Sequence, residues 1–455
     1  MGDRESNAGL ARLLRESGWT HAQLARRANR IGAELNMSLR YDESAVAHWL
    51  GGTVPRERAR RCVVEAFSRK LDRPVTYAEA GFPVPRNGQP DTEVDLVEGL
   101  IELGRHDMDS SRRGVLGAGL FSVALAVPGW PDVVARAEAL KTGWSARIGM
   151  ADVEMVRSMT DRVSDLDDQY GGRHARPLAA TILVNTVADA LRADAGPGVR
   201  KAMMSAASDL CYLAGYMAVD EGLHGLAQQY YVKALELAGG AEDHLTYCTT
   251  LRGMSVQAAG LGHGSKALDL ANAAAAASPA AGPRMRAFLV GQQAHAAAMT
   301  GDRTGALRQM SEAEQDLSRA DSQMPAMGRY DAAALNYHVA QMRFELKDTK
   351  GSVESLIQSS RLRYDVYRRT RVLHGAMLAE RQFQLGHLEA ACHTWKAALD
   401  EYHLVQSGRV DERMRTMVRL VRPHTGNAYA RDLHEQARAT LPARLTAASS
   451  GAKRV

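Results

Sequence analysis

The chain has 455 residues, of which 45% are hydrophobic and 24% charged, close to the proportions of folded globular proteins. These values exclude a chain that is disordered throughout, and an aromatic content of only 5%, together with abundant alanine, argues against an all-β fold. The net charge of +5 lies in the first fifth of the chain, because residues 1–90 hold 15 basic and 10 acidic residues and the remainder holds 42 of each. A small basic region on a neutral body indicates a module that contacts a polyanion, joined to a part with another role.

Residues 7–70 are predicted to form four short helices. Leu10, Leu13 and Leu14 keep helical spacing until Gly18 ends the first helix. Thr20 and Gln23 form a capping-box pattern at the start of the second helix, in which each residue can satisfy the other's backbone amide. The buried stripe of this second helix is expected to consist of Leu24, Ala25 and Ala28.

A third helix is predicted over about 42–50, with Asp42 as its N-cap. Its inner face is expected to consist of Val46, Trp49 and Leu50. Gly51-Gly52 end this helix and Pro55 follows, after which a fourth helix runs from about Glu57 to Lys70.

A stretch rich in Pro and Gly at 83–92 predicts a linker. We therefore expect a helix-turn-helix domain over 1–82, a linker with connecting helices over 83–135, and a helical repeat domain over 136–455. In the middle region, Arg112-Arg113 precede an apolar stretch and resemble a twin-arginine export signal. The stretch has only ~14 residues where a membrane span needs about 20, so a buried helix is the better interpretation and no membrane contact is expected.

Five segments of the C-terminal region share one pattern, in which a small residue is followed by a larger apolar residue four positions later and a second small residue three positions after that. They are Ala227/Tyr231/Ala234, Ala267/Ala271/Ala274, Ala306/Met310/Ala313, Val353/Ile357/Ser360 and Ala391/Trp395/Ala398. Each follows a turn rich in Gly or Asp, and successive segments begin 40, 39, 47 and 38 residues apart. Small residues let two antiparallel helices approach closely, so the pattern predicts stacked helical hairpins.

This pattern over about 205–400 resembles tetratricopeptide repeats (TPR), although their usual period of about 34 residues is shorter. The best match is Gly386–Leu399 and the poorest is Val353–Ser360. Residues 136–204 are expected to be helical but fit no repeat.

The head of the chain carries a second resemblance. The motif Thr20-His21-Ala22-Gln23-Leu24-Ala25, followed by Ser44–Gly52 and Pro55, resembles the helix-turn-helix of the phage-repressor (XRE-like) family. The chain departs from that family at Asn29–Ser44, about fifteen residues where a tight turn is usual. This longer element either extends the second helix or adds a wing. The fold class expected is all-α: a small helix-turn-helix domain followed by an α-solenoid of TPR-like helical hairpins.

The resemblance implies that the third helix enters the major groove of double-stranded DNA. Ser44 and His48 would point outward and hydrogen-bond to bases, and Ala47 would touch a thymine methyl group. Phosphate contacts are expected from the arginines that flank this helix and from the start of the second helix. The residues concerned are Arg40, Arg56, Arg58, Arg60, Arg61, Thr20 and Gln23. The alternative is a three-helix packing module with a solvated arginine face.

The whole architecture resembles a class of actinobacterial regulators of differentiation and secondary metabolism, and more loosely peptide-sensing quorum regulators. The resemblance implies a DNA-binding transcriptional regulator whose array senses a peptide or small molecule, binds a protein, or forms a dimer interface. A homodimer is expected, because one such head rarely buries enough surface for tight specific binding. The alternative is a protein-interaction adaptor whose array binds a partner protein and whose head does not read DNA.

The densest basic run of the array is a candidate ligand site. This run, at 361–371, could bind an acidic peptide or a carboxylate on the concave face. It consists of Arg361, Arg363, Arg368, Arg369 and Arg371 with Tyr364 and Tyr367, and the predicted ligand-binding residues are Arg361, Arg363, Tyr364 and Arg368. The more common role of such a run is a solvated helix face paired with nearby acids. Packing between hairpins is likewise the more common role of the other candidates for an aromatic ligand wall, namely Tyr212, Tyr216, Tyr230 and Tyr231.

No enzyme motif is found. Gly260–Lys266 has the order Gly-Ser-Lys where a phosphate loop needs Gly-Lys-Ser/Thr, and Gly117-Ala118-Gly119 lacks the third glycine of a dinucleotide fingerprint. We therefore expect no catalytic residues, no cofactor and no metal. The four cysteines, Cys62, Cys211, Cys248 and Cys392, lie far apart and show no zinc-ligand spacing. Without a signal-peptide pattern near Asp3 and Glu5, these free thiols predict a cytoplasmic protein.

Overall fold

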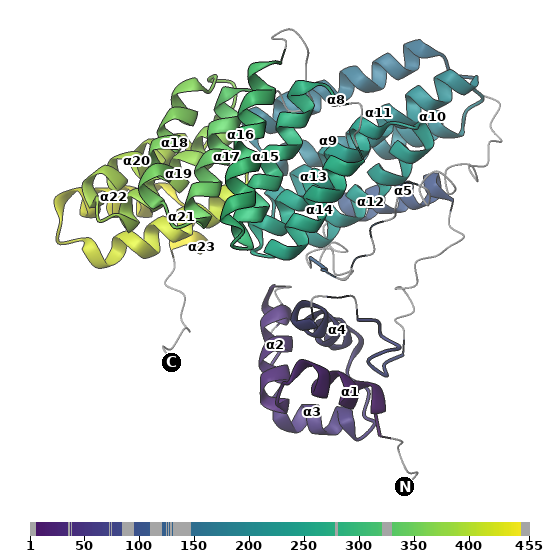
Figure 1. The fold of residues 1–455 in the computed structure, drawn as a ribbon, viewed down its shortest axis with the longest axis horizontal. Helices are drawn as coiled ribbons and strands as arrows, with labels where there is room; N and C mark the ends of the chain where they lie inside the picture. Colours follow the sequence, from purple (N-terminus) through teal and green to yellow (C-terminus); the bar gives the residue numbers. More distant parts are fainter. Residues whose placement is uncertain are drawn as a thin grey trace.

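The structure, a computed structural model, describes residues 6–34, 37, 39–71, 73, 75–83, 95–109, 121–123, 125, 127, 130, 147–277, 281–320 and 330–446 (Figure 1). Within these residues the elements are helical and no β-strand is present, which confirms the all-α class. A small group of N-terminal helices, which we call the head, is followed by an elongated, solenoid-like stack of helices, which we call the array (Figure 1). The linker predicted at 83–92 lies almost wholly outside the described residues, as does most of the apolar stretch at 111–130.

The head contains four helices around one hydrophobic core. They are α1 (Ala8–Ser17), α2 (His21–Glu34), α3 (Glu43–Leu50) and α4 (Glu57–Leu71). The predicted inner residues of the first three helices are buried, apart from Leu50, which is partly buried against the same core. The capping box at the start of α2 is present, because the Thr20 amide donates to Gln23 Oε1 at 2.9 Å and the Gln23 amide donates to Thr20 Oγ1 at 3.2 Å.

The long connection between α2 and α3 is fixed by a side chain. Asn29 donates from Nδ2 to the Tyr41 carbonyl at 2.8 Å and accepts from the Tyr41 amide at 2.9 Å. Tyr41 then packs edge-on against Trp49 of α3, with ring centroids 5.0 Å apart. Of the two predicted alternatives, the extension of the second helix is therefore the observed one, since α2 runs on to Glu34 and the described part of the connection contains no strand.

The array begins with helices that precede the repeats. They are α5 (Leu96–Met108), α8 (Met150–Tyr170), α9 (Gly172–Ile182), a π-helical turn (Leu183–Val187) and α10 (Ala188–Arg192). Although α5 belongs to the region expected to connect the two parts, its apolar side chains share the main core of the array.

Ten helices follow as five hairpins (Figure 1). They are α11 (Pro197–Asp220) with α12 (His224–Ala241), α13 (His244–Gly260) with α14 (Gly264–Ala276), α15 (Pro283–Met299) with α16 (Arg303–Ser318), α17 (Ala332–Glu345) with α18 (Thr349–Leu362), and α19 (Arg368–Gln384) with α20 (Leu388–Tyr402). The described chain ends with α21 (Gly408–Val421), a 3-10 turn (Arg422–His424), α22 (Ala428–Thr440) and α23 (Ala443–Thr446).

Each hairpin turn contains one residue with positive φ, five positions before a fully buried small residue. The turn residues are Gly222, Gly262, Gly301, Lys347 and Gly386. The corresponding small residues are Ala227, Ala267, Ala306, Ser352 and Ala391, each 0% exposed. The repeat is therefore set by a left-handed turn residue, which brings the start of the second helix against the first helix.

The fourth predicted segment was wrong by one residue. Val353 and Ile357 are only partly buried and Ser360 is exposed, whereas Ser352, Leu356 and Ser359 are buried. The hydroxyls of Ser352 and Ser359 donate to carbonyls of α17 at 2.7 Å, which allows the two helices close approach. The predicted register of this segment was wrong because the turn residue is Lys347 (φ 68°) and not a glycine. The nearest glycine, Gly351, lies inside the helix.

The beginning and the end of the array are joined. The Gln406 amide donates to the Tyr170 carbonyl at 2.6 Å, and the Arg173 amide donates to the Gln406 carbonyl at 3.1 Å. Arg369 of α19 pairs with Asp167 of α8 at 2.7 Å, and Asp220 accepts from Ser407 Oγ at 2.9 Å. The array therefore closes on itself, although these residues are about two hundred positions apart in the sequence.

A short segment, Phe121–Val123, connects the head to the array. Glu65 of α4 accepts from Ser122 Oγ at 2.8 Å and from the Val123 amide at 3.1 Å. On the other side, Ser122 exchanges two backbone hydrogen bonds with the side chain of Gln228, and Phe121 stacks on His263 with ring centroids 5.1 Å apart. We call this segment the bridge.

Across the described part of the chain, none of the helices combines the length and the apolar character that crossing a membrane requires.

Candidate functional site

The first candidate site is the outer surface of α3. Val46 and Trp49 are buried and hold the helix to the head, while Ser44, Ala47 and His48 are exposed. Asp42 caps the helix by accepting from the Ala45 amide at 2.9 Å. In Figure 1, α3 and α1 lie on the side of the head away from the array, so this surface is open to a large partner.

Of the predicted phosphate contacts, Arg40 precedes α3 in the chain and Arg56 follows it, while Thr20 and Gln23 lie at the start of α2. Thr20, Gln23, Arg40 and Arg56 are exposed. Neither Arg40 nor Arg56 forms an ion pair with any described carboxylate, so both charges are available to an external anion. Only the backbone of Arg58 is described, at the start of α4, and its side chain lies outside the described residues.

The second candidate site is a cavity of about 2100 Å³ along the inner face of the array. The first helix of each hairpin contributes to its wall: α11, α13, α15, α17 and α19. Helices α8 and α21, which close the array, also line it, as do the bridge residue Phe121 and parts of α2 and α4 of the head. The cavity thus reaches from the array to the head and is larger than the ~300–1,000 Å³ of an ordinary small-molecule site.

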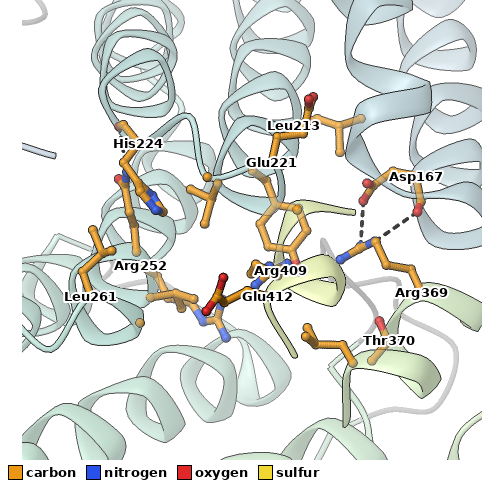
Figure 2. Close-up of a pocket in the computed structure, with 18 of the residues that line it drawn as sticks. Asp167, Leu213, Glu221, His224, Arg252, Leu261, Arg369, Thr370, Arg409 and Glu412 are labelled. Atoms are coloured by element: carbon orange, nitrogen blue, oxygen red, sulfur yellow. Dashed lines mark hydrogen bonds and ion pairs between the residues drawn. The ribbon is translucent and has the colours of Figure 1, made fainter. Parts of the chain in front are cut away.

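One end of the cavity holds a compensated cluster of buried charges. Asp167 pairs with the guanidinium of Arg369 (Figure 2). The same guanidinium lies 3.6 Å from Asp220, to which Arg409 also donates at 3.1 Å. Burial raises the pKa of Asp167 to about 7, because it outweighs the attraction of Arg369, and the neighbouring charge of Asp220 adds to the rise. For Asp220, burial is outweighed by Arg369 and Arg409, so its pKa is lowered. The same two arginines outweigh burial at Tyr216 and lower its pKa. This cluster is the closure of the array described above.

A second group, around Arg252 of α13, is not compensated in this way. Its Nε donates to the Phe288 carbonyl at 3.1 Å, and its guanidinium lies over the Phe288 ring, 3.7 Å from the centroid. One terminal nitrogen lies 3.2 Å from His338 Nε2, and no described carboxylate pairs with it. Burial lowers the pKa of Arg252.

The protonation of His338 follows from these contacts. Arginine can only donate, so His338 Nε2 must accept and the ring proton must lie on Nδ1, where it donates to the Tyr330 hydroxyl at 2.8 Å. Burial, reinforced by Arg252 and His295, lowers the pKa of His338 well below its ordinary value. The imidazole is therefore neutral at pH 7 and does not compete with Arg252 for an anion.

A third group lies near the end of α18. The Nε of Arg363 is buried without a hydrogen-bond partner among the described residues, and one terminal nitrogen contacts Ser359 Oγ at 3.4 Å. Burial lowers the pKa of Arg363. Nearby, His374 stacks in parallel on Tyr337 at 4.1 Å, and its buried Nδ1 also has no described partner.

The array residues proposed from the sequence occupy different places. Arg363 lines the cavity, whereas Arg361 and Tyr364 are exposed and lie outside its wall, with Tyr364 70% exposed. Arg368 also lies outside the wall and faces Glu401 at 3.8 Å. The basic run is therefore divided, because Arg363, Tyr367 and Arg369 line the cavity whereas Arg361, Tyr364 and Arg368 lie outside its wall.

The tyrosines proposed as an aromatic wall divide into two pairs. Tyr212 and Tyr216 line the cavity, whereas Tyr230 and Tyr231 are fully buried between helices.

The sequence analysis did not identify Arg252 as a residue of the cavity wall. Arg252 stands between Leu251 and Gly253 in a helix whose neighbouring residues are mostly buried. A lone arginine on an otherwise buried helix face is the signal that could have identified it, because such a charge requires a partner. His338 carries the same signal in α17.

Among the described residues, no group of three or more His, Cys, Asp and Glu side chains is arranged to hold a metal ion.

Comparison with known proteins concerns the head. A family model described as the SP15 N-terminal domain matches residues 10–83, a region that contains nearly all of α1 and the whole of α2, α3 and α4. No curated protein matches the chain.

Proposed function

We propose that this chain is a DNA-binding transcriptional regulator of the XRE-like type. Its head reads operator DNA with α3, and its TPR-like array senses a ligand and joins two subunits in a homodimer. The architecture's resemblance to actinobacterial regulators extends the proposal to control of differentiation or secondary metabolism in the cytoplasm. No enzymatic activity is part of the proposal.

The observation that carries the proposal is the division of α3 into two faces. Val46 and Trp49 anchor the helix, and Ser44, Ala47 and His48 stand on the opposite, exposed face. An exposed helix face with one hydroxyl, one methyl group and one imidazole suits base edges in the major groove. Arg40 and Arg56 add unpaired positive charge beside it, which suits phosphates.

The first experiment measures binding to a random DNA duplex as a function of salt concentration. Arg40→Ala and Arg56→Ala should each reduce the slope of log K against log salt by about one, since each removes one phosphate contact. Arg308→Ala is the matched control, because it removes the same charge from an exposed position on α16 of the array. A flat salt response, or equal effects of all three variants, would favour the adaptor function instead.

The second experiment tests base reading. The operator is first identified by genomic footprinting of the full chain, and Ser44→Ala and His48→Ala are then compared on operator and random duplexes. Each should lose about 1–3 kcal/mol of discrimination while random-duplex affinity is unchanged. Equal loss on both duplexes would assign these side chains to the fold or to phosphates.

A further inference from the structure

We propose that the cavity is a binding site for a small organic anion, with Arg252 holding its carboxylate or phosphate, Arg363 adding a second positive charge to the same cavity wall, and the surrounding aromatic rings holding its apolar body. This deepens the sensing role given to the array and rests on that proposed function only for its consequence at the DNA.

The first argument is the set of free donors on Arg252. A guanidinium carries five N–H donors, of which the Phe288 carbonyl and His338 Nε2 take two. The remaining donors have no acceptor among the described residues. Stacking on Phe288 fixes the plane of the group, and Figure 2 shows Arg252 extending into the cavity. A fixed guanidinium with donors to spare matches the two oxygens of a carboxylate or phosphate.

The second argument is the free-energy cost of burying the guanidinium groups of Arg252 and Arg363 without a bound anion. A buried cation without a paired carboxylate is unfavourable, and burial lowers the pKa of Arg252 and of Arg363, which at Arg363 outweighs the opposing charge of Asp331. The arginines at the closure of the array differ, since carboxylates compensate Arg369 and Arg409. Arg252 and Arg363 thus retain capacity for an external anion, which would relieve the cost.

The third argument concerns the body of the ligand. Phe288 and Tyr330 pack edge-on at 5.6 Å beside Arg252, and Tyr337 lies parallel to His374. All four of these rings line the cavity. Neutral rings favour an apolar or aromatic group next to the anionic one, a combination typical of small organic acids.

The fourth argument concerns size. The contacts of Arg369 with Asp167 and of Ser407 with Asp220 hold α8, α11, α19 and the start of α21 together at one end of the cavity. A small molecule fits such a site without breaking these contacts.

The experiment uses the full chain without DNA and three probes of one shape: 1-naphthoate, 1-naphthyl phosphate and the neutral 1-naphthamide. Binding is measured by calorimetry and by the shift in melting temperature. At least one of the two anions should bind at least about ten-fold more tightly than the amide, and the preferred anion distinguishes a carboxylate from a phosphate ligand.

The variants Arg252→Met and Arg363→Met should each weaken anion binding by about ten-fold or more and leave naphthamide binding unchanged. Arg252→Lys and Arg363→Lys keep the charge and should lose less. Arg361→Met is the matched control, because Arg361 is exposed only two residues from Arg363, and it should bind as the unaltered chain does. Circular dichroism establishes that each variant is folded, and the lysine variants serve if a methionine variant is not.

Three results would overturn the proposal: equal affinity for the amide and both anions, unchanged anion affinity in folded variants of both arginines, or no saturable binding of either anion up to about 10 mM. Operator binding is measured separately on the same variants without any probe. Loss of probe binding with normal operator binding locates the effect in the cavity, whereas failure of the unaltered chain to bind DNA contradicts the proposed function and leaves the cavity result standing.

Discussion

Asp209 of α11 shows how burial in the cavity wall determines the behaviour of a single residue. Its carboxylate accepts from Thr246 Oγ1 at 2.9 Å, but burial outweighs this hydrogen bond and raises its pKa to about 7. Below the ordinary pKa of 3.8, the group is protonated in both folded and unfolded chains. Between that value and about 7, the unfolded chain loses the proton and the folded chain keeps it, so stability falls as the pH rises.

We therefore expect Asp209→Asn to remove a decline of up to about 4 kcal/mol in the free energy of unfolding between pH 4 and 7. The measurement is urea unfolding of the variant and of the unaltered chain across this range. Buried His295, whose pKa burial lowers to about 4, acts in the opposite direction as the pH falls below 6.5, so the difference between the two proteins is the quantity to compare. Asp269→Asn, at an exposed position on α14, should show no such difference, and a parallel pair of pH profiles for Asp209→Asn would contradict the expectation.

Single residues were predictable from the sequence where their role is local. The capping pair Thr20 and Gln23 and the N-cap Asp42 lie next to the amides that they satisfy, so spacing alone identifies them. Arg252 was not predictable, because its contacts with Phe288 and His338 lie 36 and 86 positions away in the sequence.

At the scale of helices, two glycines in first helices of hairpins should respond in opposite ways to alanine. A Cβ at Gly291 of α15 would lie 2.5 Å from the Tyr330 hydroxyl and 2.7 Å from His338 Nδ1, which are themselves hydrogen-bonded. A Cβ at Gly375 of α19 would meet only Ala398 Cβ, at 3.8 Å. Gly375→Ala should raise the free energy of unfolding by about 0.5–1 kcal/mol through helix propensity, whereas Gly291→Ala should lower it by about 1–3 kcal/mol. Thermal unfolding of both variants checks this. Stabilisation by both substitutions would show that Tyr330 and His338 can move away from a Cβ at Gly291 at little cost in free energy.

The hairpin turns allow a second paired test. Lys347 adopts φ 68° at the position where Gly386 adopts φ 83° in the next hairpin. A side chain is strained in this region, so Lys347→Gly should stabilise the array by about 0.5–1 kcal/mol and Gly386→Ala should destabilise it by about 1 kcal/mol. Chemical unfolding measures both changes. If Lys347→Gly were instead destabilising, contacts of the lysine side chain would outweigh backbone strain.

Helix positions were largely predictable because small-residue spacing and turn glycines identify each hairpin. Four of the five segments had the observed register, and the exception is the turn that uses Lys347 where the others have glycine. A pattern that depends on glycine cannot detect a strained lysine in the same conformation.

At the scale of the whole molecule, the closure of the array depends on Arg369. Its guanidinium is 2% exposed and pairs with Asp167 and Asp220. Arg369→Met leaves two buried carboxylates without this partner and should lower the free energy of unfolding by about 3–5 kcal/mol. Arg371→Met removes the same charge two residues away, where the arginine is 26% exposed and pairs with Glu401, and should cost less than about 1 kcal/mol. Chemical unfolding compares them, and similar losses would mean that the closure contributes little.

The closure itself was not predictable from the sequence. The pattern of small residues describes how each hairpin packs on its neighbours, and a repeat array needs only such local contacts. Nothing in that pattern indicates that α8 meets α19, or that Asp220 accepts a hydrogen bond from Ser407, 187 positions away.

The titration of Glu65 depends on whether the bridge lies against the head. Burial raises the pKa of Glu65, and the hydrogen bonds that this carboxyl accepts from Ser122 and Val123 come from the same segment that Gln228 of the array holds. A motion that withdraws the bridge from α4 would expose Glu65 to water and lower its pKa from the value that burial imposes. Following the carbon resonance of this one carboxyl through a pH series would therefore distinguish docked from released heads in solution, and would do so without any added label.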